Sequence, residues 1–177
     1  KHNYITAENY AEYGVGEEYI GYLLGIDAYG RTVTLKNGTL SFTGNARLRF
    51  DYQKDEADSR PLATFENVNF VGENNQSVLQ TYSNGATNRP QFRFVNCSWS
   101  NASMEFGSAS GQYAYDVSFE GCTLESTVGL SNGKGLVNFG HGILGTVVVK
   151  ETSFSYTTKG NWCYALCVNG QGAVSME

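Results

Sequence analysis

Residues 92–106 read FRFVNCSWSNASMEF, and this stretch decides the fold. Aromatic residues alternate with polar or small ones, as in a half-buried strand, until Asn96 and Cys97 interrupt the pattern. The alternation then resumes with its phase moved by one residue. Nearly the same interruption occurs in VSFEGCTL (residues 117–124), whose start lies 25 residues further along the chain. An interruption that recurs at the same place indicates a structural repeat.

The opening stretch contains one of five copies of an eight-residue unit, which align without gaps. Units 1 to 5 are VTLKNGTL (33–40), ATFENVNF (63–70), FRFVNCSW (92–99), VSFEGCTL (117–124) and VVVKETSF (147–154), and their starts are 30, 29, 25 and 30 residues apart. The first, third, sixth and eighth columns hold apolar or small residues, whereas the seventh always holds a small polar one. We therefore expect these four columns to face inward.

The fifth column explains the interruption. Asn and Gly tolerate a positive φ angle best, and one residue in that conformation bends the chain sharply and changes which side chains face inward. Each unit is therefore predicted to be two short strands joined by a corner residue. Glu151 is the exception, because its corner must be either strained or built differently. The predicted corner column consists of Asn37, Asn67, Asn96 and Gly121.

A third apolar stretch follows each unit and completes the fold prediction. The stretches are 46–50, 77–82, 103–106, 135–139 and 164–168. Three strands per repeat predict an all-β, right-handed parallel β-helix (a solenoid) of about five to six coils with an N-terminal cap. An antiparallel sandwich also has short alternating strands and Gly-rich turns. It is disfavoured because its strands would not share one eight-residue template with the corner in register.

The recurring pattern F-x-N-C-x-W resembles the right-handed parallel β-helix superfamily, the pectate-lyase-like fold, in which an Asn ladder occupies one turn. The resemblance covers about residues 20–177. There is a looser resemblance to β-helix repeat regions of large surface proteins of Gram-positive gut bacteria. The superfamily implies the fold, and it contains many polysaccharide lyases and hydrolases, so the resemblance alone does not select a function.

The two ends of the chain depart from the template. Residues 1–19 lack it, and we expect them to form a cap segment with a short helix, ahead of a β-helix domain over residues 20–177. GAVSME (172–177) fits the first four columns of a sixth unit, with Val174 and Met176 inward. This suggests a domain truncated at its C-terminal end, whose open coil is a candidate surface for end-to-end self-association.

Composition limits the partners. The formal net charge is −5 and no basic stripe exists, so we expect no nucleic-acid partner. No apolar run approaches the roughly 18 residues of a membrane span. The abundance of Asn, Ser, Thr, Gly and Tyr with few Lys suits an extracellular or cell-surface location. We expect Cys97, Cys122, Cys163 and Cys167 to be small buried residues, although a 97–122 disulfide stays open in an oxidising setting.

Candidate catalytic groups are sparse. An enzyme of the β-helix class needs clustered acids and a basic residue, but Glu66 and Glu120 in the fourth column lie two units apart, at about 10 Å. Asp51, Glu105 and His141 share a face only in some registers, and no orienting partner for the histidine is evident. We therefore assign no catalytic residue, no metal ligand and no cofactor.

The aromatic residues outside the core columns are the best functional candidates, because such side chains stack on sugars or anchor protein contacts. They are Tyr52, Tyr82, Tyr113, Tyr115, Tyr156 and Trp162. We expect a non-catalytic, adhesin-like surface module that binds a glycan or a host protein through loops on a rigid scaffold. The alternatives are a fragment of a β-helix polysaccharide lyase or glycoside hydrolase, and a part in end-to-end assembly.

Overall fold

The computed structural model of the chain describes residues 22–27, 32–52, 62–83, 90–107, 115–143, 145–170 and 173–177. The expected cap, residues 1–19, lies outside the described residues. The strands are β1 (Tyr22–Asp27), β2 (Thr32–Ser41), β3 (Arg47–Tyr52), β4 (Leu62–Ser83), β5 (Gln91–Val95), β6 (Ser98–Phe106), β7 (Asp116–Glu120), β8 (Thr123–Leu130), β9 (Gly135–Ile143), β10 (Thr146–Lys150), β11 (Ser153–Thr158), β12 (Tyr164–Gly170) and β13 (Ala173–Met176).

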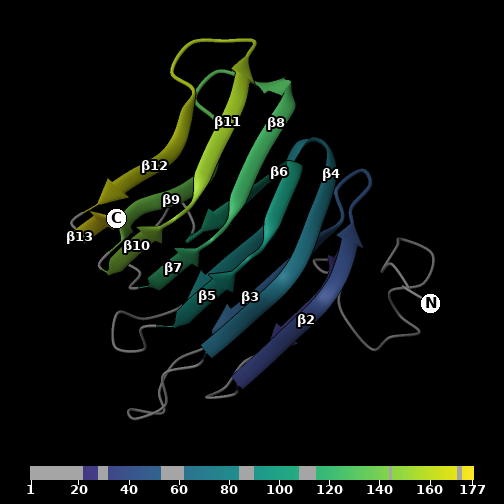
Figure 1. The fold of residues 1–177 in the computed structure, drawn as a ribbon, viewed down its shortest axis with the longest axis vertical. Coiled ribbons are helices and arrows are strands. Elements are labelled where there is room, and N and C mark those ends of the chain that lie inside the picture. Colours follow the sequence, from purple (N-terminus) through teal and green to yellow (C-terminus); the bar gives the residue numbers. More distant parts are fainter. Residues whose placement is uncertain are drawn as a thin grey trace.

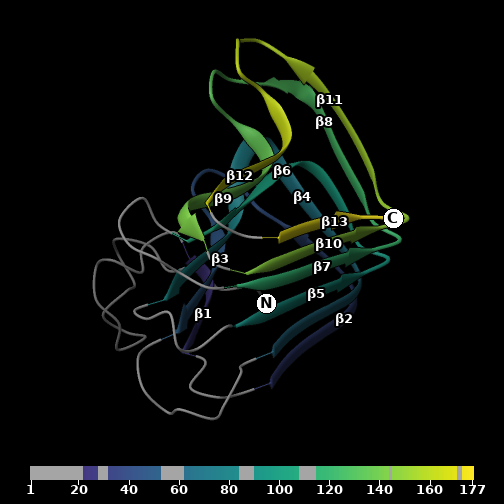
Figure 2. The ribbon, with the colours of Figure 1, turned by 90° about the vertical axis from the view of Figure 1, so that its left-hand side faces the viewer.

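These strands form an all-β parallel β-solenoid of about four turns, with no helix among the described residues. Strands β2, β4, β5, β7, β10 and β13 stack in this order as the first sheet, one above another in Figure 2. The second sheet stacks parts of β2, β4, β6, β8 and β11, and the third stacks β1, β3, β4, β6, β9 and β12 (Figure 1). About four turns is fewer than the expected five to six coils, and that expected count is not confirmed. The right-handed sense stays a prediction.

The register confirms the alignment of the units. The first column pairs Val33 with Ala63, Phe92, Val117, Val147 and finally Val174, each on the next strand of the first sheet. Val174 and Met176 therefore take the positions expected of a sixth unit. They are 45% and 67% exposed because no described strand covers the free edge of β13.

The corner column is confirmed by the backbone. Asn37, Asn67 and Asn96 have φ angles of 56°, 54° and 50°, and Gly121 has 62°. Glu151 has a φ of 48°, so its corner has the same shape as the others and is strained. The Asn67 amide donates a hydrogen bond to the Asn37 side-chain oxygen at 3.0 Å. The corners thus stack in the same way as the strands.

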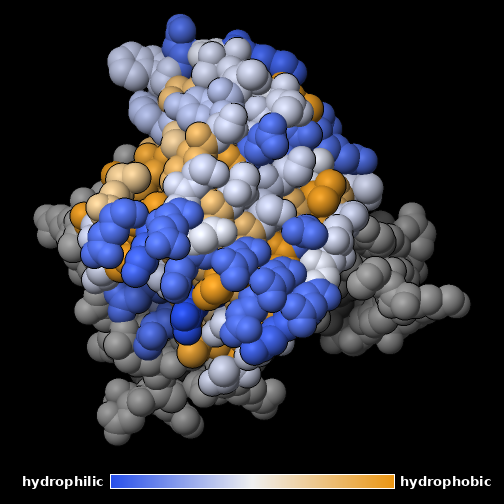
Figure 3. Space-filling view, in the orientation of Figure 1, coloured by the Kyte–Doolittle hydropathy of each residue, from blue (hydrophilic) through white to orange (hydrophobic). Residues whose placement is uncertain are grey.

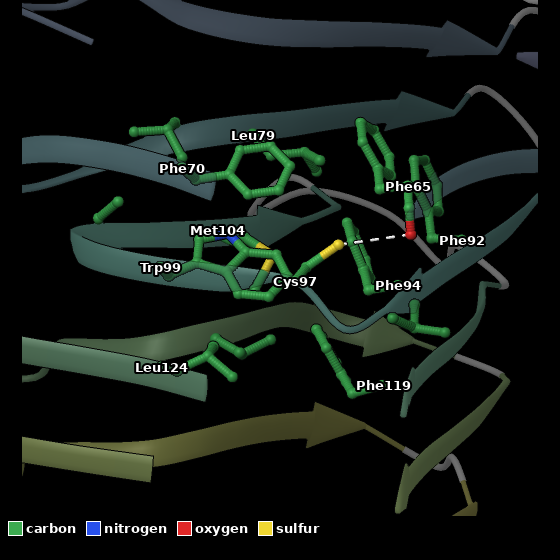
Figure 4. Packing of buried hydrophobic residues seen from close by; sticks show 14 of the residues in the cluster. Phe65, Phe70, Leu79, Phe92, Phe94, Cys97, Trp99, Met104, Phe119 and Leu124 are labelled. Atoms are coloured by element: carbon green, nitrogen blue, oxygen red, sulfur yellow. Dashed lines mark hydrogen bonds between the residues drawn. The ribbon is translucent and has the colours of Figure 1, made fainter. Parts of the chain in front are cut away.

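Aromatic ladders fill the core between the sheets. Phe94 stacks on Phe65 at 4.9 Å between ring centroids and on Phe119 at 5.1 Å, and Trp99 stacks on Phe70 at 4.8 Å (Figure 4). These five side chains are at most 1% exposed. Each such pair contributes about 0.5–1.5 kcal/mol beyond its buried area. Because each turn buries these rings against its neighbouring turns, a single turn could not be stable alone.

Candidate functional site

The aromatic candidates divide into exposed and buried residues. Trp162 is 76% exposed and its φ angle is 59°, a strained conformation for an aromatic residue. Tyr156 is only partly buried and packs against the core. Tyr113 and the side chains of Tyr52 and Tyr82 lie outside the described residues. Trp162 is thus the candidate that clearly remains available to a ligand.

The expectation that Tyr115 is exposed is wrong. Its side chain is 0% exposed and packs between Phe92 and Phe106, at centroid distances of 6.2 and 6.3 Å. The alternation of β7, with Val117 and Phe119 inward, extends one step before the strand and turns Tyr115 inward as well. Tyr115 is therefore a core residue.

The outer face of the first sheet carries ion pairs. The Lys36 ammonium lies 2.7 Å from the Glu66 carboxylate, and the Arg93 guanidinium lies 3.5 Å from that of Glu120. Val95 separates the two glutamates in the register. Hydrophilic side chains dominate the lower half of the face in Figure 3. Since each carboxylate already has a cationic partner, this arrangement does not bring acids together.

Cys97 and Cys122 occupy the inward sixth column in neighbouring units, and both are free thiols at 2% exposure. The Cys97 sulfur contacts the Phe65 carbonyl at 3.4 Å (Figure 4). A hydrogen bond from the Cys122 thiol lowers the pKa of Cys97 to about 7, and the same bond together with burial raises the pKa of Cys122. Their burial withholds both thiols from any large substrate. No three His, Cys, Asp or Glu side chains in the described ranges gather closely enough to hold a metal ion.

A notch opens in the surface where the second corner of unit 3 is shorter than the second corners of units 2 and 4. The second corner is the chain between the eighth residue of a unit and the middle of its third strand. Five positions separate Trp99 from Met104, which pairs with Leu79 and Val137 in the third sheet. The matching separation is nine positions from Phe70 to Leu79 in unit 2, and thirteen from Leu124 to Val137 in unit 4. The corners of units 2 and 4 therefore project past that of unit 3.

Residues 72–76, an irregular part of β4 where its register with β6 shifts, form a loop-like wall of the notch. The Gln76 side chain holds it by accepting hydrogen bonds from the Glu73 and Asn74 amides and donating one to the Phe42 carbonyl. A Cβ atom on Gly72 would lie 2.4 Å from the Asn101 carbonyl oxygen, so only glycine lets the loop pass there. At its tip, the Asn75 amide donates a hydrogen bond to the Gly129 carbonyl at 3.0 Å. Unit 2 therefore contacts unit 4 across the corner of unit 3.

The opposite wall is the turn of unit 4, residues 129–134. The turn of unit 5, residues 159–163, packs against its far side. The Asn161 amide donates to the Asn132 side chain at 2.6 Å, the Gly133 amide donates to the Asn161 carbonyl at 3.2 Å, and the Cys163 sulfur contacts the Ser131 carbonyl at 3.3 Å. The exposed Trp162 therefore lies on a turn that supports this wall.

The notch encloses a cavity of about 410 Å³. The outer surface of the third sheet lines it with Glu105, Asn138 and Cys167, which share one outward column. The other polar side chains of the lining are those of Asn74, Asn75, Gln76, Ser77, Ser103, Ser131 and Lys134. This volume falls within the usual range for small-molecule sites. Sequence reasoning missed the notch, although the 25-residue spacing after unit 3 was its signal.

Glu105 is the only member of the proposed Asp51, Glu105 and His141 face whose side chain the structure describes. The register pairs Asp51 with Tyr82 and Glu105 with Gln80, so Asp51 and Glu105 do not align. Within the described ranges, no helix has the length and apolarity that crossing a membrane requires. Comparisons with protein-family models, curated proteins and solved structures gave no match to this chain.

Proposed function

We propose that this chain is a non-catalytic, extracellular or cell-surface module that binds a glycan at the notch. The observation that carries the proposal is the notch itself, a cavity of about 410 Å³ with a mixed polar and apolar lining on an otherwise regular scaffold. Its amides, hydroxyls and carboxylate are the groups that orient hydroxyl-rich ligands. The exposed Trp162 and the 38% exposed Tyr164 lie beside one wall and offer apolar faces for further sugar rings.

The geometry of the acids favours binding over catalysis. Hydrolysis of a glycosidic bond uses two carboxylates that flank the bond, one of them protonated. Glu105 is the one carboxylate among the residues that line the notch, and Glu66 and Glu120 are held by cations elsewhere. Membership of the pectate-lyase-like superfamily, with its right-handed coil, is compatible with this proposal. The module would then be a member of that superfamily without an active site.

The test is a glycan screen on the protein and on a variant in which the notch is filled. Inserting Gly-Glu-Asn-Asn between Ser100 and Asn101 gives the second corner of unit 3 the length found in unit 2. We expect the protein to bind at least one glycan and the filled variant to lose that binding while its circular dichroism stays unchanged.

The control carries the same four residues inserted within residues 53–61, and we expect it to bind as the original protein does. Equal glycan binding by the filled variant would show that the notch is not the site. If the original protein binds no glycan in the screen, the proposed function is wrong.

A further inference from the structure

The hydrogen-bonding groups in the notch are unequally available to a ligand. Both ends of the Gln76 amide are occupied by the backbone of Phe42, Glu73 and Asn74. Both ends of the Asn138 amide are occupied by the backbone of Gly135, at 3.1 and 2.9 Å. These two side chains shape the cavity and have little capacity left for a ligand.

Two of the three serine hydroxyls that line the notch, those of Ser77 and Ser103, offer only lone pairs. Ser77 donates its proton to the Leu79 carbonyl at 3.1 Å, and Ser103 donates its proton to the Asn75 carbonyl at 3.0 Å. A hydroxyl carries one proton and two acceptor lone pairs. Both oxygens therefore present acceptors to the cavity.

Two stronger acceptors in the notch have no partner. The Asn75 side-chain nitrogen donates to Gly129, which fixes the amide orientation and leaves its buried oxygen without a hydrogen bond. Within the described part of the chain, the half-buried carboxylate of Glu105 has neither a hydrogen bond nor an ion pair. An acceptor that is shielded from water and left unpaired is unfavourable, so a ligand that supplies a donor to it binds more tightly.

The ligand that matches such a site supplies several donors and one positive charge. Calcium requires six to eight oxygen ligands, usually with several carboxylates, whereas the lining of the notch has one. A primary ammonium group has three donors and one charge, and it fits one carboxylate with neutral oxygens around it. We propose that the notch binds the ammonium group of an amino sugar, so that its ligand is a glycan with free amines. This inference rests on the proposed glycan binding and specifies its ligand.

Lys134 allows the predicted positive charge of the ligand to be tested within the same site. It is exposed, it lines the notch, and its ammonium group has no ion pair among the described residues. A cationic ligand is repelled by this group. Replacing Lys134 by Met should therefore strengthen the binding of an amino sugar, whereas the same change would weaken the binding of an anionic sugar.

The experiment is calorimetric titration at pH 6 with a glucosamine tetramer, its fully N-acetylated form, and a tri-lysine peptide. We expect the glucosamine tetramer to bind at least tenfold more tightly than either of the others. Glu105→Gln should weaken its binding about tenfold or more, and Lys134→Met should strengthen it severalfold. The matched control is Glu125→Gln, an exposed carboxylate outside the notch, which should leave the affinity within twofold.

The outcomes separate this inference from the proposed function. If the acetylated tetramer binds as tightly as the free amine, glycan binding stands and the ammonium inference is overturned. Affinity unchanged by Glu105→Gln, or lowered by Lys134→Met, overturns it as well. Equal binding of tri-lysine would show that the sugar is not recognised. If neither tetramer binds and the glycan screen is empty, both proposals fail together.

Discussion

Three glycine-to-alanine substitutions test the corner geometry, because they add the same methyl group in three different settings. Gly121 is a corner residue with a φ of 62°, and an added Cβ would lie 2.5 Å from the Asn96 side-chain oxygen. Gly133 has a φ of 67°, but its Cβ would meet nothing within 4 Å. Gly38 has an ordinary φ and equally open surroundings. The series therefore separates backbone strain from steric contact.

The expected magnitudes follow from these settings. At Gly38, alanine reduces the entropy of the unfolded chain and should stabilise by up to about 1 kcal/mol. At Gly133, the left-handed conformation costs an alanine about 1–2 kcal/mol, so a net loss of about 1 kcal/mol is expected. At Gly121, moving the Asn96 side chain off its rotamer adds about 0.5–1.5 kcal/mol, giving a loss of about 2 kcal/mol.

The assay is urea denaturation followed by circular dichroism. With a slope of about 2 kcal/mol per molar urea, the Gly121 variant should shift the midpoint down by roughly 1 M and the Gly133 variant by about half of that. The slope must stay constant, because a changed slope would mean that the transition is no longer comparable. A Gly121→Ala variant as stable as the original would refute the corner at this position.

Three further predictions concern the core, the surface and the ends. A thiol reagent added to the native protein should modify the half-buried Cys163 and Cys167 well before Cys97 and Cys122; equal rates by mass spectrometry would show that the core opens readily. Trp162→Ala should leave the midpoint of unfolding nearly unchanged, because alanine carries the same left-handed backbone strain and the replaced side chain is 76% exposed, and it should weaken glycan binding; unchanged binding in the titration would remove this residue from the site. The free edge of β13 predicts a molecular mass that rises with concentration in light scattering, and a strict monomer would contradict end-to-end association.

The scaffold was predictable because it repeats. A single asparagine that interrupts a strand pattern, such as Asn96, has many explanations. Five aligned units with the interruption at the same position are explained only by a corner that recurs once per turn. The same alignment predicted the register and the inward columns, since residues that stack in a solenoid must satisfy the same environment in each turn. Glu151 shows the strength of this constraint, because its neighbours force it into a conformation that glutamate disfavours.

The notch was not predicted, because it arises where the repeat is broken. Second-corner residues such as Asn75 match no template, and the contact between Asn75 and Gly129 joins residues 54 positions apart. The exposure of Tyr115 was predicted incorrectly for a related reason. Outside the eight-residue template nothing in the sequence shows which side of the chain is inward, whereas the strand continues its alternation into Tyr115.

The most direct test of the account is a nuclear Overhauser measurement on isotope-labelled protein, read at the side-chain amide protons of Asn75. Stacking in register with a short corner in unit 3 places these protons against Gly129, with 3.0 Å between the amide nitrogen and the carbonyl oxygen. We predict cross-peaks from the Asn75 side chain to Gly129 and Leu130, together with backbone cross-peaks that link Trp99 to Leu124. Backbone cross-peaks shifted to another register, or an Asn75 side chain that contacts unit 3 alone, would contradict the account.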